Sequence, residues 1–160
     1  MNSYDIIGDI HGEADALTRL LETLGYSQIE GIYSHPERQA LFLGDFIDRG
    51  PGQREVLNIV RPMVDNGTAL AVMGNHEFNA IAYATPNRDT YLRLHNDKNR
   101  RQHAAFLDAF KTDEDGYQSA IGWFKTLPLW LDLPELRVVH ACWDDALIDR
   151  IINEYDGAWL

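Results

Sequence analysis

The sequence contains little cysteine, no long apolar run and few basic residues. Cys142 is the single cysteine, so no internal disulfide can form, and no stretch approaches the roughly 18–20 apolar residues of a membrane span. The first residues, Met1 to Asp5, lack the basic and apolar regions of a signal peptide. These absences predict a cytoplasmic protein that does not bind membranes.

The charge balance disfavours bulk nucleic-acid binding. The 14 lysines and arginines are outnumbered by 25 aspartates and glutamates, which leaves a formal net charge of −11 at pH 7. Such a surface repels a polyanion wherever no local basic patch intervenes. We interpret the dense basic run at 98–103 as a solvated helix face in preference to a substrate clamp. The basic side chains of this run are Lys98, Arg100, Arg101 and His103.

Apolar runs that alternate with amphipathic helices predict an α/β fold. With 160 residues the chain has the length of one ordinary domain, and we expect a single domain over residues 1–160. Strands are predicted at 4–10, 40–43 and 69–73, with a hairpin formed by 130–133 and 136–140. Helices are predicted at 13–25, 55–64, 104–110 and 144–155.

Two segments are harder to assign. Pro62 lies inside the predicted helix at 55–64, where it is expected to kink the helix or to end it early. The stretch 85–116 is polar and has little periodicity apart from the helix at 104–110. We interpret this stretch as an excursion that can cover the site as a lid.

Polar side chains follow the predicted strands. Asp9, Asp45 and Asn75 each come directly after a glycine at the end of an apolar run. Ligands gather at the carboxyl ends of strands in open α/β sheets, and the glycines allow tight turns and close approach of the backbone. Asp9 and His11 are two residues apart, so an extended backbone would place both on one face, where they can bind one cation. Asp45 is then placed to bridge to a second cation.

These clusters offer carboxylate, imidazole and amide donors. Such donors suit Mn, Fe, Zn or Mg, and there is no thiolate cluster of the zinc-ribbon type. Each residue also has a simpler explanation, since Asn75 can be a turn residue, His76 a helix cap and His140 a core histidine. Four such coincidences at strand ends in one chain are much rarer than one. The combined pattern therefore indicates a metal site.

Three sequence blocks resemble the signatures of calcineurin-like metallophosphoesterases. They are Gly8–Gly12 (GDIHG), Gly44–Pro51 (GDFIDRGP) and Gly74–Glu77 (GNHE). The branch they resemble most is the phosphoprotein phosphatase type, which includes bacterial serine/threonine phosphatases and symmetrical diadenosine tetraphosphatases. The resemblance extends to about His140 and implies an α/β fold in which mixed β-sheets form a sandwich flanked by helices.

The resemblance implies two divalent metal ions as cofactors. Manganese is expected, with iron, zinc or magnesium as alternatives. Asp9 and His11 correspond to ligands of the first ion, and Asp45 corresponds to the carboxylate that bridges both ions. Asn75 and His140 correspond to ligands of the second ion.

The resemblance also implies hydrolysis of a phosphate ester by attack of a metal-bridging hydroxide. Two cations about 3.5–4 Å apart can generate such a hydroxide and neutralise phosphate oxygens during in-line attack. Arg49 corresponds to a catalytic, substrate-binding guanidinium, whose planar fork matches phosphate oxygens. His76 corresponds to the proton donor to the leaving group and Asp48 to its carboxylate partner, which favours the imidazolium form.

Residues 141–160 depart from the family pattern. Members of the family have a further metal-binding histidine in a downstream Gly-His block, but residues 141–160 contain no histidine. Cys142 and Trp143 also follow His140 where a glycine is usual. We therefore expect a chain truncated at its C-terminus, without the last strands of the family domain and with reduced activity.

The substrate and part of the function stay open at the level of sequence. A phosphoserine or phosphothreonine protein and a dinucleoside polyphosphate are equally compatible with the motifs. A catalytically impaired domain that binds metal or phosphate and acts through a partner is the alternative from another functional class. A nucleophilic pair of Cys142 and His140 is a weaker alternative, because the chain has no Cys-x5-Arg phosphate loop. The oligomeric state is not predicted.

Overall fold

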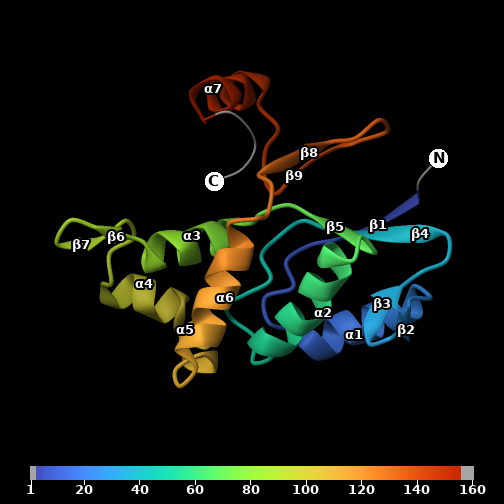
Figure 1. The fold of residues 1–160 in the computed structure, drawn as a ribbon, viewed down its shortest axis with the longest axis horizontal. Helices are drawn as coiled ribbons and strands as arrows, with labels where there is room; N and C mark the ends of the chain where they lie inside the picture. Colours follow the sequence, from blue (N-terminus) through green and yellow to red (C-terminus); the bar gives the residue numbers. More distant parts are fainter. Residues whose placement is uncertain (1–2, 156–160) are drawn as a thin grey trace.

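A parallel sheet lies at the centre of the molecule. The structure is a computed structural model that describes residues 3–155. The strand order in the sheet is β1–β4–β5 (Figure 1). The strands are β1 (Ser3–Ile7), β4 (Arg38–Phe42) and β5 (Ala69–Ala71). Ile7 is in register with Phe42, and Phe42 with Ala71, so the carboxyl ends of the three strands meet at one edge.

Helices cover one face of this sheet, below the strands in Figure 1. The covering helices are α1 (Ala14–Thr23) and α2 (Gln53–Asp65). Their apolar side chains form one buried cluster with alternate sheet residues such as Ile7, Phe42 and Ala71. Between α1 and β4 the chain forms a hairpin of β2 (Ser27–Ile29) and β3 (Ile32–Ser34). The helices thus hold the sheet from below and leave its carboxyl edge free for the site loops.

The helix α2 continues through Pro62 to Asp65, so the expected early end is wrong. Val60 and Met63, on either side of the proline, are completely buried in the core below the sheet. A proline removes one intrahelical hydrogen bond, whereas burying an apolar side chain of this size contributes about 1.5–3 kcal/mol. Tertiary packing therefore outweighs the local penalty.

A second layer of strands covers part of the opposite face of the sheet. β8 (Trp130–Asp132) and β9 (Arg137–Val139) form an antiparallel hairpin, as the sequence predicts. Val138 of this hairpin is buried against Leu41 and Val72, in a core cluster separate from the one under the helices. The expected α/β architecture of packed strands with flanking helices is confirmed, and the parallel and antiparallel pairs lie in separate sheets.

The polar stretch at 85–116 has more regular structure than its sequence predicts. It follows α3 (Asn75–Ala84), which begins at the site. The elements after α3 are β6 (Pro86–Asn87), β7 (Thr90–Tyr91), α4 (Asp97–Gln102), α5 (Ala104–Ala109) and α6 (Glu114–Phe124). α5 matches the helix predicted at 104–110, whereas the sequence pattern does not predict α6. Phe106 is completely buried and Phe110 is buried, so this stretch contributes to the core as well as bordering the site.

The last described helix is α7 (Asp145–Tyr155), which matches the helix predicted at 144–155. It lies beyond the β8–β9 hairpin, on the opposite side of the molecule from α1 and α2 (Figure 1). Leu147 and Ile152 on this helix are 57% and 46% exposed. Within residues 3–155, no helix has the length and apolar content that crossing a membrane requires.

Candidate metal and phosphate site

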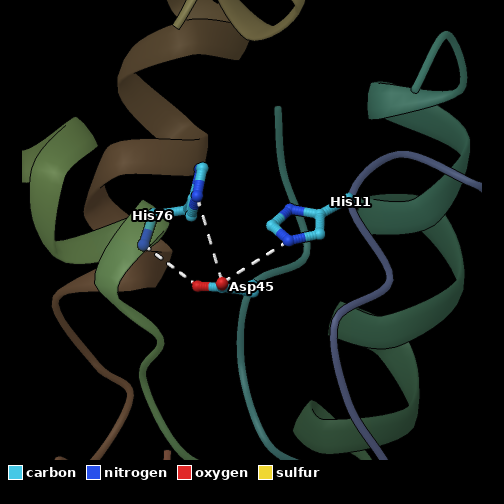
Figure 2. A group of neighbouring side chains, drawn as sticks. All are labelled: His11, Asp45 and His76. Carbon is cyan, nitrogen blue, oxygen red and sulfur yellow. Dashed lines mark hydrogen bonds and ion pairs between the residues drawn. The ribbon is translucent and has the colours of Figure 1, made fainter. Parts of the chain in front are cut away.

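The predicted site residues gather at the carboxyl edge of the parallel sheet, around Asp45. His11 reaches Asp45 from the loop that follows β1, and His76 reaches it from the first turn of α3 (Figure 2). Their Nε2 atoms lie 3.6 and 4.0 Å from Oδ2 of Asp45. Nε2 of His140, which follows β9, lies 3.6 Å from the other carboxylate oxygen, Oδ1. One carboxylate is therefore faced by three histidines from three separate segments of the chain.

Asp45 belongs to two groups of donor atoms that can hold a cation. The first group is His11, Asp45 and His76, and the second is Asp9, Asp45 and His140. The ligand atoms of each group lie within 4.8 Å of one another. This grouping separates Asp9 from His11, which the sequence pattern places together on an extended backbone. The backbone at Asp9 and His11 is left-handed and not extended, with φ of 52° and 46°, and the binding of one cation by both residues stays a prediction.

Hydrogen bonds on the far side of two histidines determine which ring nitrogen faces Asp45. Nδ1 of His11 lies 3.0 Å from the carbonyl oxygen of Ile47, and Nδ1 of His140 lies 2.7 Å from that of Leu43. A carbonyl oxygen only accepts, so each Nδ1 carries the hydrogen and each neutral ring has a lone pair on Nε2. Metal-binding histidines are commonly oriented in this way.

Asn75 lies beside the second donor group and adds a further oxygen atom to it. Nε2 of His140 lies 3.0 Å from Oδ1 of Asn75 and 3.6 Å from Oδ1 of Asp45. When Nε2 carries no hydrogen, a nitrogen lone pair, an amide oxygen and a carboxylate oxygen face one another, and a positive charge between them stabilises such a set. The arrangement therefore fits a divalent cation with nitrogen and oxygen ligands.

Left-handed backbone is concentrated in the site loops. Among residues 3–155, five of the seven non-glycine residues with positive φ are predicted site residues: Asp9, His11, Asp45, Asp48 and Arg49. Such conformations cost about 1–3 kcal/mol each and persist where the surrounding structure imposes them. The strain thus coincides with the residues that the sequence motifs mark as functional.

Two glycines permit the loops after β4 and β5 to lie against each other. A Cβ on Gly44 would overlap the backbone of Gly74, and a Cβ on Gly74 would overlap the backbone nitrogen and carboxylate of Asp45. Close approach, which the sequence predicts for these glycines, is therefore confirmed. A Cβ on Gly8 would make only ordinary contacts of 3.5 Å with the side chain of Leu43, so close approach does not require glycine at that position.

Glu77 links the loops after β4 and β5 by hydrogen bonds, a role that the sequence motifs do not predict. Its carboxylate accepts hydrogen bonds from the backbone nitrogens of Asp45 and Phe46, each at 2.8 Å, and from that of Gly74 at 3.0 Å. The side chain is completely buried, and burial raises the pKa of Glu77. Glu77 lies three residues after the N-cap Gly74 of α3 and forms the glutamate half of a capping box, while the glycine has no side chain to complete the sequence pattern.

His76 and His103 hold Asp48 from both sides. Nδ1 of His76 lies 2.7 Å from Oδ2 of Asp48, and Nδ1 of His103 lies 2.9 Å from Oδ1. His103 is only 4% exposed and packs against the rings of Tyr83 and Phe106. Its interpretation as part of a solvated helix face is therefore wrong. No sequence pattern marks it, because its burial depends on packing between distant segments.

Asp48 and His76 stabilise each other's charged forms. Burial favours the protonated carboxyl group, but hydrogen bonds from His103 and His76 outweigh this effect and lower the pKa of Asp48. The hydrogen bond to Asp48 raises the pKa of His76, while burial opposes that change. Because Nδ1 of His76 is bonded to Asp48, the proton that this imidazolium can release is the one on Nε2.

The other marked residues lie nearer to solvent. Arg49 is exposed and lines an open pocket together with His76. Lys98 and Arg100 are exposed, as expected for a solvated face.

Cys142 is exposed, and its thiol contacts the carbonyl oxygen of Trp143 at 3.8 Å rather than a histidine. The contacts of the thiol therefore do not support the nucleophilic pair.

Comparisons with known proteins agree with these motifs. A family model described as calcineurin-like phosphoesterase matches residues 4–157. The bis(5'-nucleosyl)-tetraphosphatase PrpE of Bacillus subtilis is 35% identical over 144 residues, which cover 87% of this chain and 57% of that protein. PrpE of Halalkalibacterium halodurans is 49% identical over 74 residues, which cover 46% of this chain and 30% of that protein. The chain thus spans only part of the length of these curated relatives. Both relatives are named asymmetrical tetraphosphatases, whereas the sequence resemblance points to a branch that includes symmetrical ones.

Solved phosphatase structures share the fold. A cold-active protein-tyrosine phosphatase from a psychrophilic Shewanella species matches 93% of this chain and 46% of its own, with a TM-score of 0.61 and 17% identity. A protein serine/threonine phosphatase from Saccharomyces cerevisiae matches 81% of this chain and 34% of its own, with a TM-score of 0.54 and 22% identity. At such identities the likeness shows the fold alone.

Proposed function

The chain belongs to the calcineurin-like phosphoesterase family, and from this premise we propose that it hydrolyses phosphate esters with the help of two divalent cations. The observation that supports this most is the position of Asp45, whose Oδ2 lies 3.6 Å from Nε2 of His11 and whose Oδ1 lies 3.6 Å from Nε2 of His140. A carboxylate shared in this way is what a pair of neighbouring cations requires.

The proposed metal ligands are the five that the family motifs mark, namely Asp9, His11, Asp45, Asn75 and His140. Nitrogen and oxygen donors of this kind suit manganese, which we propose first, and also iron, zinc or magnesium. Cations at such a site lower the pKa of water and neutralise charge on phosphate oxygens. His11 and His140 contribute by presenting Nε2 lone pairs that their Nδ1 hydrogen bonds hold in place.

Two further side chains are proposed to act on the substrate. Arg49 has no carboxylate partner among the described residues and can donate two parallel hydrogen bonds to phosphate oxygens. His76, with its pKa raised by Asp48, is proposed to donate the Nε2 proton to the departing oxygen. Asp48 keeps the imidazole in the protonated form and in the correct orientation, and His103 holds Asp48 in turn.

A metal assay combined with a hydrolysis screen tests this function. The purified chain is loaded with Mn, analysed for metal content and offered an aryl phosphate, a phosphoserine peptide and diadenosine tetraphosphate. We expect bound metal and hydrolysis of at least one substrate, and neither in the Asp45→Asn variant. Because the named relatives are tetraphosphatases, a dinucleoside polyphosphate is the substrate we propose first, with the phosphopeptide as the alternative.

A domain that binds metal without turnover is the second candidate. Asp9 and Asn75 are exposed, and the described residues after His140 contribute no ligand to either donor group. The ion near His140 would therefore be held largely by exposed side chains. Stoichiometric metal binding without hydrolysis of any of the three substrates would favour this candidate.

A further inference from the structure

An open pocket of about 450 Å³ adjoins the site on the side of His76. Its walls come from the loop after β4, from the start of α3 and from α4 and α5. The lining residues are Arg49, His76, Arg101, Gln102, Ala104 and Ala105. His76 and Gln102 also line the adjacent hollow that is bordered by Asp48 and Asn75, so the two hollows share part of their lining.

The pocket is positively charged in a strongly acidic chain. Two of its lining residues are arginines and none is a carboxylate, although the net charge of the chain is −11. Arg49 and Arg101 form no ion pair with the described residues, whereas Arg54 pairs with Asp113 at 2.6 Å. Unpaired guanidinium groups beside an open hollow can bind an external anion, and the planar fork of arginine suits phosphate.

The two arginines occupy different places relative to the attacked phosphate. Arg49 comes directly after Asp48, in the same loop as Asp45, and so belongs to the corner in which hydrolysis is proposed. Arg101 comes from α4, a different element that also lines the pocket. Because it lies outside the loop that contains Asp45 and Asp48, it can bind a group of the substrate other than the attacked phosphate. The small side chains of Ala104 and Ala105 leave room for it.

We propose that Arg101 binds a second phosphate group of the substrate, next to the phosphate that is attacked, so that the pocket favours polyphosphate esters over simple monophosphate esters. The inference rests on the proposed function and specifies its substrate class. A polyphosphate chain carries a negative charge on every phosphate unit and so can engage Arg49 and Arg101 together. A phosphoserine residue carries a single phosphate and gains nothing from Arg101.

The chain offers a matched control for this inference. Arg100 is the neighbour of Arg101 in α4 and is exposed, but it does not line the pocket. Arg101→Gln and Arg100→Gln therefore remove the same charge from the same helix, and only the first removes it from the pocket. Both side chains are exposed, so neither variant disturbs the core.

The first measurement is the ratio of kcat/KM for diadenosine tetraphosphate to that for p-nitrophenyl phosphate, with Mn present. We expect this ratio to fall about tenfold in Arg101→Gln, mainly through KM, because one charge-assisted interaction with phosphate is lost. The ratio in Arg100→Gln should equal that of the parent chain. Equal ratios in all three proteins would overturn the inference.

The second measurement is equilibrium binding, which does not depend on turnover. A methylene-bridged, non-hydrolysable dinucleoside tetraphosphate and inorganic phosphate are titrated into each protein at the same Mn concentration. Arg101→Gln should weaken binding of the analogue about tenfold and affect phosphate much less. Equal weakening in both variants would show a general charge effect and overturn the inference. If the parent chain hydrolyses no substrate, the proposed function fails, and the titration still decides the role of Arg101.

Discussion

The loops after β4 and β5 are held far more firmly than the segment that carries His140. Asp45 is 4% exposed and Glu77 is completely buried, and the backbones at Gly44 and Gly74 touch. His140, in contrast, follows a three-residue strand and contacts the carbonyl oxygen of Leu43 and Oδ1 of the exposed Asn75. Most of residues 141–154 are exposed.

The two halves of the site are therefore held in place by different interactions. The first half consists of the loops around Asp45 and Glu77, and the second half is the segment that carries His140. In the first half, burial and backbone hydrogen bonds place the donor atoms before any ligand arrives. In the second half, a short hairpin and contacts with the carbonyl oxygen of Leu43 and with Asn75 place the histidine.

Asp45→Asn should remove both ions, because Asp45 is the only residue present in both donor groups of the described chain. Elemental analysis after Mn loading and desalting measures the loss. Asp9→Asn, which touches one group, is the comparison and should retain part of the metal. If Asp45→Asn keeps a full pair of ions while Asp9→Asn does not, the shared role of Asp45 is wrong.

His76→Asn should reduce turnover most for poor leaving groups. General acid catalysis contributes about 10²–10⁴-fold, and an alkyl alkoxide needs the Nε2 proton far more than an aryl oxide does. Steady-state rates on an alkyl phosphate and an aryl phosphate give the comparison. Equal losses on both, together with reduced metal content, would instead identify His76 as a ligand in the group that contains His11 and Asp45.

Glu77→Gln should lower the free energy of unfolding by about 2–3 kcal/mol, because the new amide group faces backbone N–H donors in a completely buried position. Urea denaturation measures the change. Glu55→Gln, at an exposed position on α2, is the control and should change stability by less than about 0.5 kcal/mol. His140→Ala should cost only about 1 kcal/mol, the typical net value of one hydrogen bond. If His140→Ala lowered the free energy of unfolding more than Glu77→Gln, the segment of His140 would be the more firmly held half of the site, contrary to this prediction.

Calorimetric titration with Mn should show two unequal binding events. The ion near His11 has a buried, preorganised group, and the ion near His140 has the less supported one, so affinities about tenfold apart are expected. In His140→Ala the weaker event should disappear while the stronger one persists. Two equally tight sites in the monomeric parent chain would show that the two ions are held equally well, which would contradict this prediction.

The sequence by itself determined the sheet and the order of the site motifs. Apolar runs that end in a glycine and a polar residue predict strands with functional loops, because buried strands need apolar side chains and their carboxyl ends meet at one edge. The sequence alone therefore predicts that Asp45, His76 and His140 lie near one another. The amphipathic period of α1 and α7 predicts those helices in the same way.

Only the tertiary structure decided how the site is held together. The left-handed backbone at Asp9 and His11, the burial of Glu77 and the contact of His103 with Asp48 arise between segments far apart in the chain. Local patterns carry no information on such contacts, since the burial of a polar side chain depends on partners that only packing supplies. Arg101 shows the same limit, because a basic run on a short helix is read as a solvated face until α4 is seen to form a wall of the pocket beside His76.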